Sequence, residues 1–261
     1  MLRIFIGMLM VIGLHAQESP ATPAGPKFEV ASLKPSAPGG RGGGIRPQGG
    51  ERYVATNAPL GMMITVAWRL KNEQVIGGPD WLNTAGFDMN AKAEKTASVE
   101  ELHRMLQNLL AERFKLQFHW EKKELPIYAL TVDKGGPQMQ PHEAATAGEP
   151  WIDQQQPQFL HMIWHGKFAP MEYFAWRLGQ LLDRPVVDMT NLKGGYDFDL
   201  SFTRELPPGI SETAQVNGQQ IDTSGPSIFA ALQKQLGLKL ERQKGPVEIM
   251  VIDHVVRPSE N

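Results

Sequence analysis

The chain has 261 residues, of which 41% are hydrophobic and 21% charged, and its formal net charge is −2. These proportions are typical of a globular protein and exclude a wholly disordered chain, a collagen and a polytopic membrane protein. The charge shows no basic excess that would indicate nucleic-acid binding, and the lack of cysteine excludes disulfides, cysteine-ligated metals and thiol catalysis.

The first 16 residues have the pattern of a cleaved secretory signal. A single charge at Arg3 precedes an apolar run from Ile4 to Leu14, which is too short for a stable membrane anchor. The small residue Ala16 ends this segment, and a polar tail follows over residues 17–27. We therefore expect a periplasmic or secreted mature protein without a transmembrane segment. An uncleaved anchor or a buried strand is the alternative.

Four helices are predicted from apolar residues at helical spacing. The first follows Pro59, and the second follows a capping-box sequence from Ser98 to Glu101. The third follows Pro170, and the fourth ends at Gly237. The apolar residues that define these helices are Leu60, Met63, Ile64, Ala67 and Leu70; Leu102, Met105, Leu106, Leu109 and Leu110; Met171, Phe174, Ala175, Leu178 and Leu181; and Phe229, Leu232 and Leu236.

Strands follow the helices in the same order. Residues 87–91 and 196–200 alternate apolar and polar side chains, so each strand should have one face on a core and the other in water. Residues 115–120 alternate in the same way, and the second half has a counterpart at Lys239 and Leu240. We expect a charged turn after each of these segments, and then a strand that begins with proline, at residues 126–133 and 246–253.

The spacing of these elements predicts an internal repeat. Phe87 and Tyr196 are 109 residues apart, whereas Pro126 and Pro246 are 120 apart, because a polar insertion at residues 205–224 enlarges the second copy. Chance matching of amphipathic elements is the alternative.

We therefore expect an α+β fold of two similar halves, each with helices packed on a mostly antiparallel or mixed sheet. The first half spans residues 28–135 and the second spans residues 157–258, with a loop at the insertion. Residues 136–156 are rich in Pro, Gln and Ala and should form a linker.

Several segments together resemble a known family. They are residues 28–36, 77–82, 109–116, 124–130, 184–188 and 245–261. In this order, over nearly the whole chain from Phe28, they resemble the soil-associated secreted family typical of acidobacteria, a domain of unknown function. The resemblance implies no catalytic residues, because the family has no established activity. Relatives joined to a membrane-embedded, regulatory-type metallopeptidase imply an extracytoplasmic sensing role, although this chain lacks that portion. The architecture also resembles the short N-terminal domains of secretins and TonB-dependent transducers.

His161 and His165 are four residues apart, a spacing that suits one metal ion only on a helix. In a strand, at about 3.3 Å per residue, they would lie roughly 13 Å apart, too far to share one ion. We expect a strand and a loop there. His142 and Glu143 begin like a zinc-protease helix, but Thr146 stands where the second histidine is needed. We predict no metal and no cofactor.

The common sequence patterns of serine acylation are missing, but a triad of scattered residues stays open. The glycine-rich residues 39–44 lack the ending of a phosphate-binding loop, so we expect a flexible loop, in which Arg41 and Arg46 could meet an anionic ligand. Asp133 and Asp253 occupy equivalent strand ends, and we interpret them as turn residues rather than an acid–base pair. We predict no catalytic residues.

Trp81 is the candidate ligand-binding residue. It follows Gly-Gly-Pro-Asp in a predicted turn, whereas most of the other tryptophans should be core or half-buried anchors. We infer an exported, non-catalytic module of the cell envelope that binds a ligand or a protein partner. The alternatives are an envelope hydrolase with a scattered active site, and an extracytoplasmic sensor or assembly domain that adds a strand to a partner.

Overall fold

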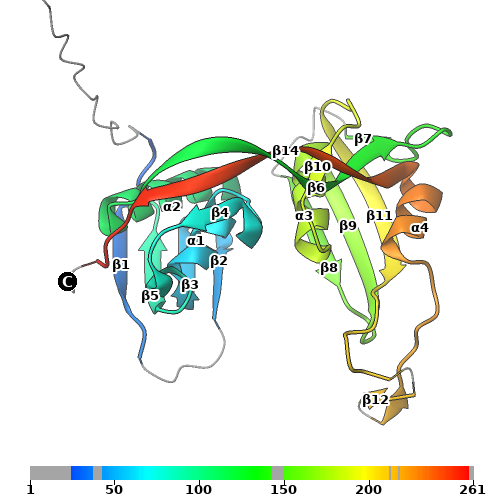
Figure 1. Ribbon diagram of the computed structural model, residues 1–261, viewed down its shortest axis with the longest axis horizontal. Coiled ribbons are helices and arrows are strands. Elements are labelled where there is room, and N and C mark those ends of the chain that lie inside the picture. Colours follow the sequence, from blue (N-terminus) through cyan, green and yellow to red (C-terminus); the bar gives the residue numbers. More distant parts are fainter. Residues whose placement is uncertain (1–24, 38–42, 143–149, 212, 217, 259–261) are drawn as a thin grey trace, which may run out of the picture.

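The computed structural model describes residues 25–37, 43–142, 150–211, 213–216 and 218–258. Within these ranges the chain forms three four-stranded sheets, a short hairpin and four α-helices, so the predicted α+β class is confirmed (Figure 1). None of the helices there has the length and apolar character needed to span a bilayer. The predicted signal segment lies outside the described residues.

The first lobe is an antiparallel sheet with two helices packed on its apolar side. Its strands, in spatial order, are β1 (Val30–Pro35), β5 (Gly86–Lys92), β3 (Arg52–Pro59) and β2 (Gly44–Gln48). Its helices are α1 (Leu60–Ala67) and α2 (Val99–Phe114). The predicted capping box is confirmed, because Ser98 and Glu101 each accept the other's backbone N–H, at 3.1 and 2.9 Å.

The second lobe repeats this arrangement. Its strands, in spatial order, are β7 (Gln140–Pro141), β11 (Gly195–Thr203), β9 (His161–Pro170) and β8 (Trp151–Gln155). Its helices are α3 (Met171–Leu181) and α4 (Ile228–Ala231), which continues into a π-helical turn (Leu232–Leu236). The hairpin β12 (Gln215–Val216) and β13 (Gln219–Gln220) lies in the predicted insertion and extends away from the lobe (Figure 1).

A long two-stranded ribbon joins the lobes (Figure 1). Its strands are β6 (Gln117–Val132) and β14 (Leu238–His254), which pair antiparallel along nearly their whole length. The short strand β4 (Val75–Gly77) pairs parallel with the end of β14 in the first lobe, and β10 (Val186–Asp188) pairs parallel with the end of β6 in the second. Each long strand therefore contributes to both lobes.

The ribbon corrects the prediction of charged turns before Pro126 and Pro246. Both charged segments continue through the middle of β6 and β14 as strand, and Leu125 pairs with Gly245 at its centre. The side chains there are mostly exposed, with Lys122 opposite Glu248, so polar residues cost little on either face. Proline is tolerated in such a ribbon at positions where the backbone nitrogen points away from the partner strand, because no hydrogen bond of the ladder is then lost.

The outer sheets have the same strand order. The first sheet has the strand order β1-β5-β3-β2, and the second has β7-β11-β9-β8. In each sheet the first, fifth, third and second strands of that lobe lie side by side, as expected of an internal repeat. The predicted faces are confirmed in both sheets, because Phe87, Met89, Tyr196 and Phe198 are buried and the intervening Asp and Asn side chains are not. Residues 136–156 differ from the expected linker, since they contribute β7 and β8 to the second sheet.

Candidate functional site

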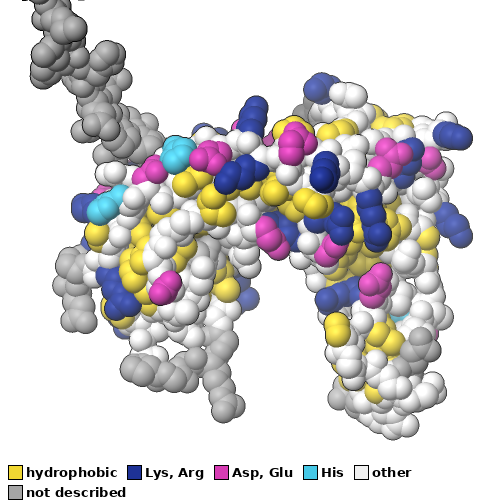
Figure 2. All heavy atoms as spheres, viewed as in Figure 1, with side chains coloured by type: hydrophobic (Ala, Val, Ile, Leu, Met, Phe, Trp, Pro, Cys, Tyr) yellow, Lys and Arg dark blue, Asp and Glu magenta, His cyan; other side chains and the backbone are white. Residues whose placement is uncertain are grey.

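A cleft of about 870 Å³ lies between the two lobes, against the central ribbon. Its walls come from the end of α1 and the start of α2 in the first lobe, from α3 and β10 in the second, and from β14. The surface is visibly hollowed between the lobes below the ribbon (Figure 2). The charged and aromatic side chains of this interlobe cleft are Trp68, Arg69, Lys71, Glu100, His103, Glu172, Tyr173, Trp176, Asp188 and Glu248.

Lys71 holds the lobes together at one side of the cleft. Its ammonium group donates hydrogen bonds to the carbonyl oxygens of Gly179 and Leu182, both at 2.6 Å. These carbonyls belong to the end of α3, where a helix has unsatisfied acceptors and a partial negative charge. The Gln180 amide donates to the Leu70 carbonyl at 3.3 Å. Burial lowers the pKa of Lys71, against the opposing effect of nearby carboxylates.

Arg69 crosses the cleft beside this contact. Its backbone is left-handed, with φ of 54°, an uncommon conformation for a residue other than glycine. The guanidinium carbon lies 5.2 Å from the centre of the Tyr173 ring and 6.0 Å from that of Trp176, and a terminal nitrogen lies 2.8 Å from a Glu100 carboxylate oxygen. Arg69 therefore combines an ion pair in its own lobe with cation–π contacts to the other.

His103 lines the cleft beside Arg69 and is 6% exposed. Burial, and then the positive charge of Arg69, lower the pKa of His103 to about 4, so the imidazole is neutral near pH 7. Its ring centre lies 5.8 Å from that of Tyr53, whose hydroxyl is buried and whose pKa is raised by that burial. The Nδ1 of His103 and the hydroxyl of Tyr53 have no hydrogen-bond partner among the described residues.

The charges of the cleft are unequal. Two cations, Arg69 and Lys71, line it together with four carboxylates, from Glu100, Glu172, Asp188 and Glu248. No serine, threonine or cysteine is among its lining residues in the part of the chain that the structure describes. The cleft thus presents aromatic rings and an excess of negative charge.

The chain belongs to the family described as protein of unknown function DUF3738. The family matches residues 61–255, which include every residue that lines the interlobe cleft. Neither the curated proteins nor the solved structures contain a match. The family match agrees with the expected domain of unknown function. It gives no support to a soil or acidobacterial source, or to the likeness with secretin and TonB-dependent transducer domains.

Trp81 of this DUF3738 chain lies outside the cleft. It belongs to a short 3-10 turn (Asp80–Leu82) and is half-buried on the first core, where its ring stacks on Phe114 and meets Phe87 edge-on, both at 6.3 Å between ring centres. The guanidinium carbon of Arg257 lies 5.4 Å from its ring centre. These contacts give Trp81 a packing role beside any role in binding.

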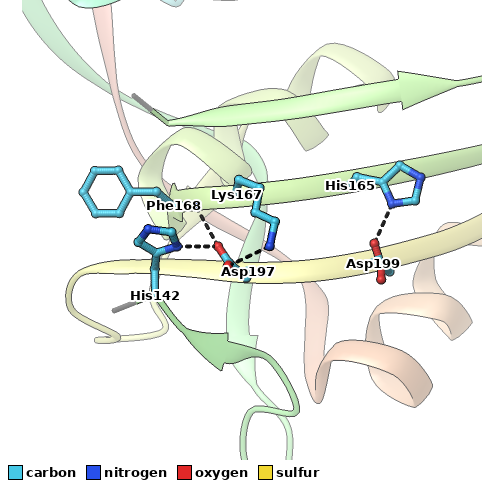
Figure 3. A network of polar contacts seen from close by, with 6 residues as sticks. All are labelled: His142, His165, Lys167, Phe168, Asp197 and Asp199. Atoms are coloured by element: carbon cyan, nitrogen blue, oxygen red, sulfur yellow. Dashed lines mark hydrogen bonds and ion pairs between the residues drawn. The ribbon is translucent and has the colours of Figure 1, made fainter. Parts of the chain in front are cut away.

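Polar contacts around Asp197 in the second lobe hold the point at which the pairing of β11 with β9 shifts register (Figure 3). The Asp197 carboxylate accepts hydrogen bonds from the Phe168 backbone N–H at 2.9 Å and the Lys167 ammonium at 3.0 Å, and contacts His142 Nδ1 at 2.7 Å. Although burial alone would raise the pKa of Asp197, these partners hold it at about 2.

The first lobe has the same arrangement of an aspartate that binds a backbone N–H where the strand pairing shifts register. Asp88 accepts hydrogen bonds from the Asn57 backbone N–H and the Ser36 hydroxyl, both at 2.8 Å. Asn57 and Phe168 both have a left-handed backbone, with φ of 43° and 47°, where β3 and β9 shift register. Because both lobes contain this arrangement, we interpret the Asp197 contacts as structural.

His161 and His165 lie on β9, as the strand interpretation requires, and they meet different carboxylates. His165 lies 2.5 Å from Asp199 (Figure 3), and His161 lies 3.2 Å from Asp222. Thr203 is the nearest candidate nucleophile, with its hydroxyl 3.5 Å from His161 Nδ1, but that hydroxyl donates to the Ser224 carbonyl at 2.5 Å. Among the described residues no group of His, Asp and Glu is arranged to hold a metal.

The structure does not bring together the two aspartates considered as an acid–base pair. Asp133 follows β6 in the second lobe, whereas Asp253 lies near the end of β14 in the first and pairs with His119 at 2.8 Å. Arg46 is exposed on β2, and Arg41 lies outside the described residues.

The sequence interpretation missed Arg69 and Lys71. The apolar pattern predicted that the first helix continues to Leu70, which placed Arg69 inside the helix and Lys71 directly after it. The helix ends at Ala67 instead, and the left-handed turn at Arg69 that directs both side chains to the other lobe has no local sequence signal.

Proposed function

We propose that this protein is an exported, non-catalytic binding module that takes its ligand in the interlobe cleft. The cleft is the observation that carries the proposal, because clefts between domains that combine aromatic walls with a few polar groups are common ligand sites. The lobes contribute different groups to it, Arg69 and Glu100 from the first and Tyr173 and Trp176 from the second. A ligand there would touch both lobes at once.

An internal repeat explains why the cleft lies where it does. The sheets share one strand order, and the ribbon ladder is centred on Leu125 and Gly245, which are 120 residues apart like Pro126 and Pro246. These observations support two copies related by a local two-fold axis through the ribbon. The interlobe cleft lies beside this axis, against β14.

The observations favour binding over the two alternatives. For a hydrolase, Thr203 would have to release its proton to His161, but its hydroxyl is already engaged with the Ser224 carbonyl. For strand addition, the long free edges of the ribbon contain Pro126, Pro246 and several charged side chains, the features by which proteins block edge pairing.

Export rests on residues 1–16 and is tested by intact mass. Production of the full-length precursor in a bacterial host with an intact secretion system should give a periplasmic or secreted product that begins at or near Gln17. A cytoplasmic product that keeps residues 1–16 contradicts export.

The binding function is tested by photo-cross-linking in cells. The photoreactive residue p-benzoylphenylalanine replaces Pro246, an exposed residue of β14 that lines the cleft, or Lys234, an exposed residue that does not line it. Irradiation should give a discrete mass increase at position 246 and none at position 234. The same adducts at both positions, or none at either, would contradict a cleft-bound ligand.

A further inference from the structure

We propose that the interlobe cleft selects a cationic ligand, one with a guanidinium or primary ammonium group. This inference rests on the proposed binding function and adds the chemical class of the ligand. It is argued from the pairing of the charges in the cleft, from the aromatic rings, and from the way the chain already holds its own arginine there.

The two cations of the cleft already have intramolecular partners. Arg69 pairs with Glu100 at 2.8 Å, and two carbonyl oxygens receive hydrogen bonds from the Lys71 ammonium group at 2.6 Å each. Neither cation is therefore available to pair with an anionic ligand without losing these contacts. An anion would also enter a cleft whose lining charges sum to a negative value.

Two carboxylates of the cleft, in contrast, have no partner. Neither the Glu172 nor the Glu248 side chain has a hydrogen bond or ion pair with any described residue, and both are exposed. Glu172 lies on α3 of the second lobe and Glu248 lies on β14 of the ribbon. A cation in the cleft can therefore meet negative charge from two walls.

The contacts of Arg69 show that this cleft suits a guanidinium. Its guanidinium is held by the Tyr173 and Trp176 rings, at 5.2 and 6.0 Å, and by the Glu100 carboxylate. Carboxylates and ring faces together are the usual partners of alkylated cations and guanidinium groups in proteins. The neutral, 94% buried His103 beside it adds no repelling charge at pH 7 and has an Nδ1 without a partner among the described residues.

The test compares peptide probes that differ at a single side chain. The mature protein is titrated at low ionic strength with acetyl-Gly-Arg-Gly amide and with the same peptide containing citrulline, the neutral isostere of arginine, or glutamate. Binding is followed by calorimetry. We expect the arginine peptide to bind roughly tenfold more tightly than the citrulline peptide, the combined effect of two partly exposed ion pairs. The glutamate peptide should bind least.

A double variant assigns the preference to the cleft. Glu172→Gln with Glu248→Gln should abolish the preference for arginine over citrulline. The matched control, Glu94→Gln with Glu205→Gln, removes the same charge from exposed residues outside the cleft and should retain the preference. Retention in the cleft variant, or loss in the control, overturns the inference.

The outcomes separate this inference from the proposed function. If the citrulline peptide binds as tightly as the arginine peptide, the cationic preference is wrong. If no probe binds but position 246 still forms its specific adduct in cells, the ligand class is likewise wrong and the cleft remains a binding site. If no probe binds and no adduct forms, both proposals fail.

Discussion

The buried imidazole of His103 should make the protein less stable in mild acid. In the unfolded chain a histidine takes up its proton near pH 6.5, whereas in the folded protein burial, and then Arg69, hold the pKa of His103 at about 4. Between these values the unfolded state binds more protons than the folded state. Stability is therefore lost as the pH falls through 6.5, and the loss is complete only below the folded pKa.

The size of this loss follows from the two pKa values. The shift of His103 from 6.5 to about 4 corresponds to a loss of about 2 kcal/mol in the free energy of unfolding at pH 5, and about 3 kcal/mol at pH 4. The side chain is only 6% exposed, so solvent screening reduces these values little.

The assay is urea unfolding followed by tryptophan fluorescence at pH 7 and pH 5. The difference between the two pH values should shrink by about 2 kcal/mol in His103→Gln, which cannot take up the proton. The comparison within each variant cancels any change in stability that the substitution causes by itself. His254→Gln, at an exposed residue of β14, is the matched control and should keep the wild-type difference. An unchanged pH dependence in His103→Gln would refute the argument.

Three further substitutions test the framework of the site. Lys71→Met should lower the free energy of unfolding by about 1–2 kcal/mol and increase the radius of gyration in solution scattering, because the carbonyls at the end of α3 lose their donor; exposed Lys193→Met should do neither. Asp197→Asn should lower the free energy of unfolding by about 1–2 kcal/mol at pH 7, measured by urea unfolding. The wild-type carboxylate stabilises the folded state fully above its ordinary pKa of 3.8 and loses this contribution as the pH falls toward 2. The difference between the variant and the wild type should therefore shrink at low pH. Gly237→Ala should cost at least about 1 kcal/mol in a thermal melt, because φ is 66° and the new Cβ would lie 2.0 Å from the Gly136 carbonyl oxygen, whereas Gly135→Ala meets no atom within 4 Å and should be nearly neutral.

The sequence predicted most helices and strands correctly because caps, glycine turns and alternating strands depend on residues that are close together in the chain. The capping box at Ser98 forms as predicted, and the π-helical turn of the second lobe ends at Gly237, whose left-handed backbone suits glycine. The alternation of residues 87–91 also gave the correct buried face, because a one-residue shift would have moved every apolar side chain into water.

The ribbon was missed because strand pairing between distant segments overrides a local polar signal. Glu121, Lys122 and Lys123 have the composition of a turn, but the β14 residues Ile249, Glu248 and Val247 lie opposite them and continue the ladder. The cleft was missed for a related reason. It is assembled from Arg69, His103 and Trp176, which are far apart in the sequence and meet only when the ribbon places the two lobes together.

Under the proposed repeat, the chemistry of the cleft belongs to one side of the two-fold axis only. At the separation of 111 residues that relates Pro59 to Pro170, Arg69 corresponds to Gln180, and Tyr173 corresponds to Met62. Gln180 keeps a polar contact with the opposite lobe through the Leu70 carbonyl, but neither it nor Met62 can form a cation–π contact. The framework contacts recur in both lobes, as Asp88 and Asp197 show, whereas the contact of Arg69 with Tyr173 has no counterpart at the equivalent described positions, Gln180 and Met62. The difference between the copies therefore coincides with the cleft.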